Sequence, residues 1–142
     1  MAEHPNVANI RRGLLLRKER EPTQEDFDFL YNLFDEDVVW HGGGTSAMWA
    51  EGVRGRDAVF QQFGQLEAAG SFQRDLLHVL ADDDHAVALV HNNVQMGDTH
   101  MEWYEAMVFH LNANGKVTEF WGIHEDAEAV DALWSSWTPA SS

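Results

Sequence analysis

The chain has no cysteine, few basic residues and no long hydrophobic run. The absence of cysteine excludes thiol nucleophiles, disulfides and thiolate metal sites. The longest apolar runs, such as residues 86–90, are far too short to cross a bilayer. Residues 1–10 lack a charged segment followed by an apolar stretch. We therefore predict no signal peptide and expect a cytoplasmic protein.

Positive charge is scarce, because 9 Lys and Arg residues stand against 24 Asp and Glu residues and give a net charge of −15. Such a surface repels phosphate backbones and anionic lipids, which argues against nucleic-acid or membrane partners. Five of the 9 basic residues cluster near the start, at Arg11, Arg12, Arg17, Lys18 and Arg20. We interpret this cluster as the solvated face of a first helix, because no aromatic platform accompanies it.

Apolar residues make up 44% of the 142 residues, which fits one domain with a hydrophobic core and a cavity. Apolar residues recur with a helical period in several segments. The predicted helices cover residues 6 to about 20, a segment that opens at Pro22 and Thr23, residues 57–69, and a last segment capped by Asp126. Residues 37–41 indicate a short strand, which Gly42, Gly43 and Gly44 end, and residues 45–54 indicate a loop.

After Gly70 the hydrophobic period changes from that of a helix to that of a strand. Four consecutive strands are predicted, at residues 72–80, 85–96, 101–111 and 116–124. The turns between them are short, so neighbouring strands should be antiparallel. This order predicts an α+β fold, in which the N-terminal helices wrap a curved antiparallel sheet into a cone with an internal pocket, and a C-terminal helix follows.

Four stretches carry a resemblance to a known family: Asp37-Val-Val-Trp-His-Gly-Gly-Gly, Gly52-Val-Arg-Gly-Arg-Asp-Ala-Val-Phe, His78-Val-Leu-Ala-Asp-Asp-Asp-His and Gly115-Lys-Val-Thr-Glu-Phe-Trp. With this element order, the chain resembles the SnoaL-like branch of the nuclear transport factor 2-like superfamily. The branch includes polyketide cyclases and other tailoring enzymes of natural-product pathways. Its relatives include ketosteroid isomerase, limonene epoxide hydrolase and non-catalytic binders. The fold alone does not choose among these functions.

The resemblance allows this chain to be compared with the functional positions of three groups of relatives. His41 occupies a place similar to the catalytic Asp of ketosteroid isomerase, but Met107 stands where that enzyme has its oxyanion-hole Asp, which argues against its mechanism. The only strand Arg is Arg74, and no Asp pair brackets it, which disfavours the epoxide hydrolase branch. The cyclases place an acid/base Asp after the Trp of the last strand. Here His124, Glu125 and Asp126 follow Trp121, and which of them is the counterpart stays open.

The two-residue alternation of strands groups side chains by face. If Met107 faces the cavity, as the isomerase comparison implies, then Trp103 and Glu105 share its side. Antiparallel pairing then suggests Leu89, His91 and Asn93 for the same wall, and the resemblance places Phe120, Gly122 and His124 inward. A bulge would shift this parity by one residue. The expected substrate-binding residues are Trp40, Trp49, His78, Leu89, His91, Asn93, Trp103, Met107 and Phe120.

The catalytic candidates are His41, His124, Glu105 and Asp126. His41 is the leading acid/base group, because histidine titrates near neutrality, although it could simply bind the Gly-rich loop. Glu105 lies in mid-strand between Trp103 and Met107, where it forms either a proton-moving pair with a histidine or a structural ion pair. No two candidate ligands have a compact metal-binding spacing, so we expect neither a metal nor a cofactor.

The six tryptophans and the shortage of Lys and Arg favour a hydrophobic ligand over a phosphorylated one. Three functions stay open: a cofactor-independent cyclase or isomerase for a polyketide-like intermediate, a non-catalytic carrier or sensor, and a structural protein with an incidental cavity. The outer face of the sheet is also expected to be apolar, with residues 86, 88, 90, 94, 104, 106 and 108 on it. An apolar outer face predicts a homodimer.

Overall fold

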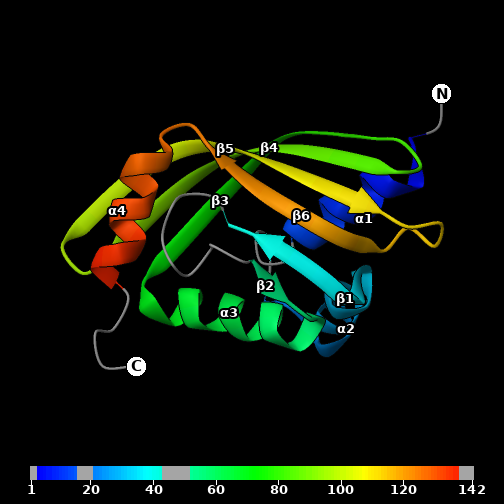
Figure 1. The fold of residues 1–142 in the computed structure, drawn as a ribbon, viewed down its shortest axis with the longest axis horizontal. Helices are drawn as coiled ribbons and strands as arrows, with labels where there is room; N and C mark the ends of the chain where they lie inside the picture. Colours follow the sequence, from blue (N-terminus) through cyan, green and yellow to red (C-terminus); the bar gives the residue numbers. More distant parts are fainter. Residues whose placement is uncertain (1–2, 16–20, 43–51, 138–142) are drawn as a thin grey trace.

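The computed structural model describes residues 3–15, 21–42 and 52–137, and Figure 1 shows the chain as a curved sheet with helices at its concave side and at one end. The helices are α1 (Pro5–Leu14), α2 (Gln24–Leu33), α3 (Arg56–Ala69) and α4 (Ala127–Trp137). The strands are β1 (Phe34–His41), β2 (Val53–Arg54), β3 (Ser71–Ala81), β4 (His85–Met96), β5 (Thr99–Leu111) and β6 (Val117–His124). The predicted α+β class, with N-terminal helices on a curved sheet and a C-terminal helix, is confirmed.

The helices begin where the sequence provides capping groups. Thr23 caps α2 in a capping box, with its hydroxyl accepting from the backbone N–H of Asp26 and the Asp26 carboxylate accepting from that of Thr23. Asp126 accepts from the backbone N–H of Ala129 at 3.0 Å at the start of α4. The first helix ends at Leu14, before the predicted end near residue 20, and residues 16–20 lie outside the described ranges.

The sheet has the strand order β2-β1-β6-β5-β4-β3. The hairpins from β3 to β6 are antiparallel, as predicted, but β1 pairs with β6 in parallel, so the sheet is mixed rather than wholly antiparallel. A parallel pair needs a long connection, and the chain between β1 and β6 is long enough to provide it. The short strand β2 pairs with β1 inside the segment that was expected to be a loop.

The β4–β5 turn sets the face of every residue in these two strands. Gly97 and Asp98 form a two-residue turn, so Met96 pairs with Thr99 and, further along, Val90 pairs with Glu105. Directly paired residues lie on the same face, and a shift of one residue reverses all of them. The concave face of β4 therefore carries Ala86, Ala88, Val90, Asn92, Val94 and Met96.

The predicted inward set on β4 is therefore wrong. Leu89, His91 and Asn93 lie on the convex outer face of the sheet, because the sequence-based pairing was off by one residue. His78 is also on the outer face, opposite Leu89, because the β3–β4 register shifts between Leu76 and His78. The same error assigned residues 86, 88, 90 and 94 to the outer face, whereas all four are buried in the core.

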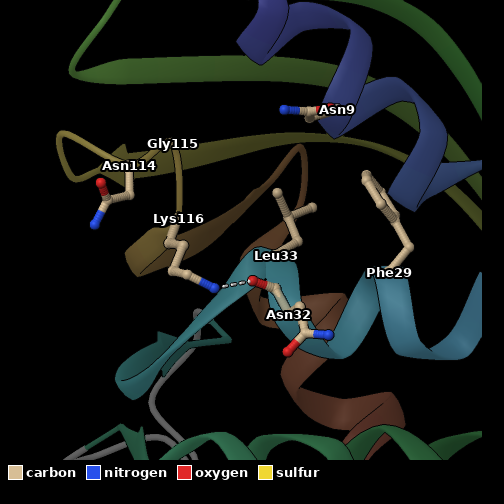
Figure 2. Close-up of a pocket in the computed structure, with 7 residues that line it drawn as sticks. All are labelled: Asn9, Phe29, Asn32, Leu33, Asn114, Gly115 and Lys116. Carbon is tan, nitrogen blue, oxygen red and sulfur yellow. Dashed lines mark hydrogen bonds between the residues drawn. The ribbon is translucent and has the colours of Figure 1, made fainter.

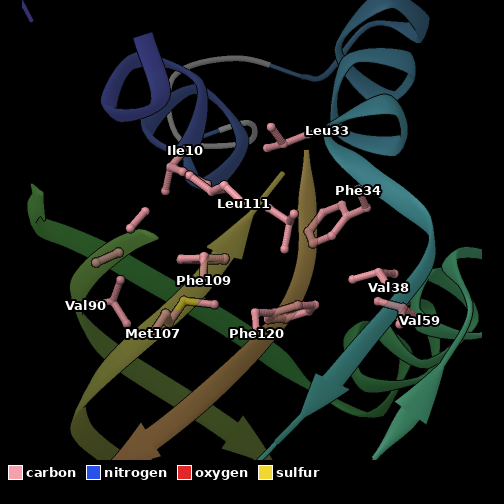
Figure 3. Close-up of a cluster of buried hydrophobic side chains, with 13 residues drawn as sticks. Ile10, Leu33, Phe34, Val38, Val59, Val90, Met107, Phe109, Leu111 and Phe120 are labelled. Carbon is pink, nitrogen blue, oxygen red and sulfur yellow. The ribbon is translucent and has the colours of Figure 1, made fainter. Parts of the chain in front are cut away.

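The core divides into two hydrophobic clusters along the concave face. The larger cluster joins Ile10 of α1, Leu33 at the end of α2 and Val59 of α3 to inward residues of the sheet such as Phe109 and Phe120 (Figure 3). The smaller cluster lies toward α4 and is made of Leu66, Val94, Met96, Trp103, Val130, Leu133 and Trp134. None of the described helices is both long enough and apolar enough to cross a bilayer.

Candidate active site

A group of polar side chains lies on the concave face between the two hydrophobic clusters. We call it the inner-face polar cluster, and its members are Arg74, Asn92, Trp103, Glu105 and His124. The members come from four adjacent strands, β3, β4, β5 and β6. On β4 and β5, the neighbours along the same face are Val90 and Met107 on one side and Val94 on the other. Polar groups in such surroundings need partners, so their hydrogen bonds define the site.

Glu105 is the centre of this cluster and is only 5% exposed. Its Oε1 atom accepts a hydrogen bond of 2.8 Å from the Asn92 amide Nδ2. The Arg74 guanidinium Nη2 lies 3.4 Å from the same oxygen, and its Nε donates to Asn92 Oδ1 at 2.9 Å. Asn92 thus lies between the cation and the carboxylate and binds both. Within the described residues, the hydrogen bonds and ion pairs of Glu105 all involve Oε1.

His124 has a defined tautomer in this network. The indole N–H of Trp103 donates to His124 Nδ1 at 2.9 Å, and an indole N–H is never an acceptor. Nδ1 is therefore unprotonated, and Nε2 carries the hydrogen that it donates to the backbone oxygen of Gly42 at 2.7 Å. The ring is consequently a neutral imidazole whose Nδ1 lies 3.8 Å from Glu105 Oε1.

Gly122 lets the Glu105 carboxylate approach the backbone of β6 closely. It faces inward on β6, and a Cβ atom added there would collide with Glu105 Oε2 and lie 3.4 Å from His124 Nε2. The missing side chain therefore lets Oε2 pack directly against the β6 backbone, close to the imidazole. A carboxylate and a neutral imidazole side by side can accept a proton at one position and return it at another.

The structure brings together only part of the predicted site. Glu105 and His124 lie in the cluster, and Trp103 joins it through its indole. Met107 contacts Arg74 through its sulfur at 3.6 Å. Phe120 stacks on Trp40 with ring centroids 5.6 Å apart on the inner face. These five residues have the inward orientation that was predicted, while their roles in binding or catalysis stay predictions.

His41 does not lie with the cluster. Its register with Trp121 in the parallel β1–β6 pair puts it on the outer face, where the two rings stack 5.1 Å apart. Its Nε2 donates to Glu119 Oε2 at 2.6 Å. Asp126 is also elsewhere, exposed at the start of α4, where it caps the helix. Trp49 lies outside the described residues.

Two members of the cluster were missed by sequence reasoning. Alternation alone places Asn92 on neither face, and Arg74 enters the sequence argument only through its bearing on the epoxide hydrolase branch. The signal for Asn92 was present, because counting back from the two-residue turn at Gly97 and Asp98 pairs it with Trp103. Arg74 follows from the β3–β4 register, which pairs it with Asn92.

A second feature is a hollow of about 300 Å³ between α1, α2 and the β5–β6 turn (Figure 2). Its lining residues are Asn9, Phe29, Asn32, Leu33, Asn114, Gly115 and Lys116. The Lys116 ammonium already donates to the backbone oxygen of Asn32 at 2.6 Å. Among the described residues that line this hollow there is no carboxylate and no histidine. Within the described ranges, no three His, Asp or Glu residues are grouped as metal ligands would be.

Comparison with known proteins places these features in a family. The model of a family described as the SnoaL-like domain matches residues 22–120. No protein of curated function matches the chain. Bal32a, a protein from a soil-derived mobile gene cassette, is 31% identical in sequence, with a TM-score of 0.77 over 91% of this chain and 95% of that chain.

Two structures from Mycobacterium tuberculosis share the fold at lower identity. An LEH-like epoxide hydrolase is 16% identical, with a TM-score of 0.65 over 92% of this chain and 96% of that chain. RV0760c, in complex with estradiol-17beta-hemisuccinate, is 16% identical, with a TM-score of 0.63 over 84% of this chain and 93% of that chain. At this identity the likeness concerns the fold alone.

Proposed function

The chain belongs to the SnoaL-like family of the nuclear transport factor 2-like superfamily, and on this premise we propose that it is a cofactor-independent cyclase or isomerase. Its substrate is a hydrophobic natural-product intermediate of polyketide type. Glu105 is the proton acceptor and His124 its partner. The observation that carries the proposal is the buried Glu105 carboxylate, with Oε1 held by Asn92 and with the His124 imidazole beside it.

Both candidate reactions begin with the same proton transfer. Glu105 Oε2 removes a proton from a carbon next to a substrate carbonyl, and the electron pair of that C–H bond forms an enolate. In an isomerisation the same proton returns to another carbon. In a cyclisation the enolate carbon bonds to a second carbonyl carbon, and the new alkoxide takes the proton. Both reactions balance without an oxidant, a reductant or a cofactor. His124 keeps its hydrogen bonds to Trp103 and to the backbone oxygen of Gly42 during the reaction.

An apolar substrate fits the surroundings of this carboxylate. Met107 and Trp103 flank Glu105 on the same face of β5, and both are buried. Holding an apolar substrate in a folded conformation beside Glu105 would itself supply much of the rate. The fold neighbours include one structure named as an epoxide hydrolase and one in complex with a steroid ester, which supports small-molecule binding by this fold. His41 has no part in the proposal, because it lies on the outer face.

Hydrogen exchange at carbon tests this function without knowledge of the natural substrate. A panel of cyclic unsaturated ketones and 1,3-diketones is incubated with the protein in D₂O, and deuterium incorporation at carbon is followed by NMR. We expect incorporation above the buffer rate, and an approximately 100-fold loss in Glu105→Gln, which is the usual size of an acid/base contribution. Glu102→Gln is the matched control, because Glu102 lies on the same strand but pairs with Asn93 on the outer face.

Equal exchange in Glu105→Gln and Glu102→Gln would contradict the assignment of Glu105.

A second function, non-catalytic binding, is favoured by one observation: Glu105 already accepts bonds from both Asn92 and Arg74, as a purely structural carboxylate would. Binding of panel members, seen as a change in tryptophan fluorescence, without any deuterium incorporation would support that function instead.

A further inference from the structure

Arg74 is the only Lys or Arg residue in the strands β1, β3, β4, β5 and β6. It lies on the concave side of β3, at the edge of the sheet, opposite Asn92. Its side chain is 37% exposed, whereas that of Glu105 is 7% exposed. Arg74 is therefore the member of the inner-face polar cluster that solvent, or a ligand, reaches most easily.

The donors of Arg74 are only partly used. A guanidinium has five N–H groups. Within the described residues, one reaches Asn92 Oδ1 and one reaches Glu105 Oε1. A third points at Met107 Sδ, 3.6 Å away, and a thioether sulfur is a weak acceptor. One N–H on each of the two terminal nitrogens remains, and the bond to sulfur is easily exchanged for a better one.

The position of the Arg74 guanidinium is not explained by a role in neutralising the Glu105 carboxylate. An arginine that serves a carboxylate normally places two parallel N–H groups on its two oxygens at about 2.7–2.9 Å. Here a single Nη2 reaches one oxygen at 3.4 Å, and Asn92 provides the shorter bond of 2.8 Å to that oxygen. Asn92 also holds Nε, so the guanidinium is fixed in place while its outer edge stays open. A fixed donor set binds its ligand at a lower entropic cost.

We propose that Arg74 binds a carboxylate group of the ligand, so that the ligand class is an apolar carboxylic acid. The open edge of the guanidinium takes the carboxylate, and the apolar body lies along the inward residues Leu76 and Phe72 of the same strand. This inference rests on the proposed ligand-binding role of the concave face, and it does not require proton transfer by Glu105. The net charge of −15 repels anions at long range, but salt screens that repulsion beyond roughly 8–10 Å.

The test compares two probes of the same size and shape, of which one is charged and one is neutral at pH 7: 1-naphthaleneacetic acid and 1-naphthaleneacetamide. Binding to the intact protein at neutral pH is measured by isothermal titration calorimetry. We expect wild type to bind the acid at least about tenfold more tightly than the amide, the usual effect of hydrogen bonds to a charged group. Arg74→Gln should remove this preference, and Arg74→Lys should keep part of it, because it retains the charge but loses the planar fork.

Arg54→Gln is the matched control, because it removes the same charge from β2, where Arg54 pairs with the outer-face residue Val39. It should keep the preference for the acid. Failure of the acid to bind at millimolar concentration, equal binding of acid and amide, or a preference that survives in Arg74→Gln would each overturn the proposal. Deuterium exchange that needs Glu105 would persist in these cases, so failure here is distinguishable from failure of the proposed reaction.

Discussion

At the scale of single residues, Gly122 determines how much room the Glu105 carboxylate has. An alanine at this position would place its Cβ against Glu105 Oε2 and near His124. We expect Gly122→Ala to lower the free energy of unfolding by about 1–3 kcal/mol, as overpacking of a closed site does. It should also abolish any deuterium exchange, because the carboxylate must move away from its place beside His124. Urea denaturation and the NMR exchange assay measure the two effects.

Gly64→Ala is the control for the Gly122 substitution. Gly64 lies in α3, and an added Cβ there meets no atom within 4 Å. Alanine is a better helix former than glycine, so this variant should be as stable as wild type or up to about 1 kcal/mol more stable. A Gly122→Ala protein that matched Gly64→Ala in stability and in exchange would show that the close approach of Glu105 to Gly122 has no role.

The residue predictions that held are those that needed only one strand. Alternation within β5 placed Trp103, Glu105 and Met107 on one face, and the structure agrees. The face of His41 depended on pairing with β6, which is remote in sequence, and no local pattern gives that register. The orientation of Glu105 could thus be predicted, but its hydrogen-bond partners on β3 and β4 could not without the correct strand register.

At the scale of elements, the β3–β4 turn depends on one carboxylate. Asp82 Oδ1 accepts from the backbone N–H groups of Asp84 and His85, both at 2.8 Å. These bonds, that from Asp84 first, lower the pKa of Asp82 below its ordinary value of 3.8. The folded turn therefore stabilises the charged form of the Asp82 carboxyl group. The contribution of Asp82 to the stability of the fold is present above pH 3.8, and it is lost as the pH falls through the lower pKa of the folded state.

Asp82→Ala should accordingly be less stable than wild type at pH 7, and the difference should shrink as the pH falls below 3.8. Urea denaturation from pH 7 to pH 3 would show this convergence. Asp84→Ala is the control, because it removes an equal charge in the same turn while leaving the backbone N–H that Asp82 binds. Equal loss of stability in both variants at pH 7 would mean that the charge of the turn matters, and not the two backbone bonds.

Element types and most boundaries could be predicted because local signals determine them. The capping box at Thr23 and the turn at Gly97 and Asp98 are determined by residues that are close together in the sequence. The strand β2 and the parallel pairing of β1 with β6 were missed for the opposite reason. Val53 and Arg54 form a strand only because β1 lies beside them, and a contact of this kind leaves no periodic pattern in two residues.

At the scale of the whole molecule, the described helices leave the outer face of the sheet uncovered. Helices α1, α2 and α3 pack residues against the concave side, in the larger hydrophobic cluster. On the outer face, Tyr104, Ala106 and Val108 lie where they were predicted. The apolar set there is completed by Val87 and Leu89 of β4 and by Trp121 and Ile123 of β6, in place of the β4 residues first assigned to it.

This outer face should join two copies of the chain. Leu80 of the edge strand β3 and Ile123 of the interior strand β6 are 72% and 57% exposed, which is unusual for large apolar side chains on a monomer. We expect sedimentation velocity at micromolar concentration and physiological salt to show a species of twice the 16.1 kDa chain mass. Because both copies carry a charge of −15, association should weaken at low salt, where repulsion is screened less.

Ile123→Asp tests the surface directly, because in a two-fold dimer each substitution places a buried charge in both halves of the interface. It should shift the population to monomer at the same concentration. Phe27→Asp is the control, since Phe27 is an exposed apolar residue of α2 and not of the sheet. A dimer that persists in Ile123→Asp but dissociates in Phe27→Asp would place the contact on the helices. A wild-type monomer at every salt concentration would mean that the apolar outer face serves some purpose other than self-association.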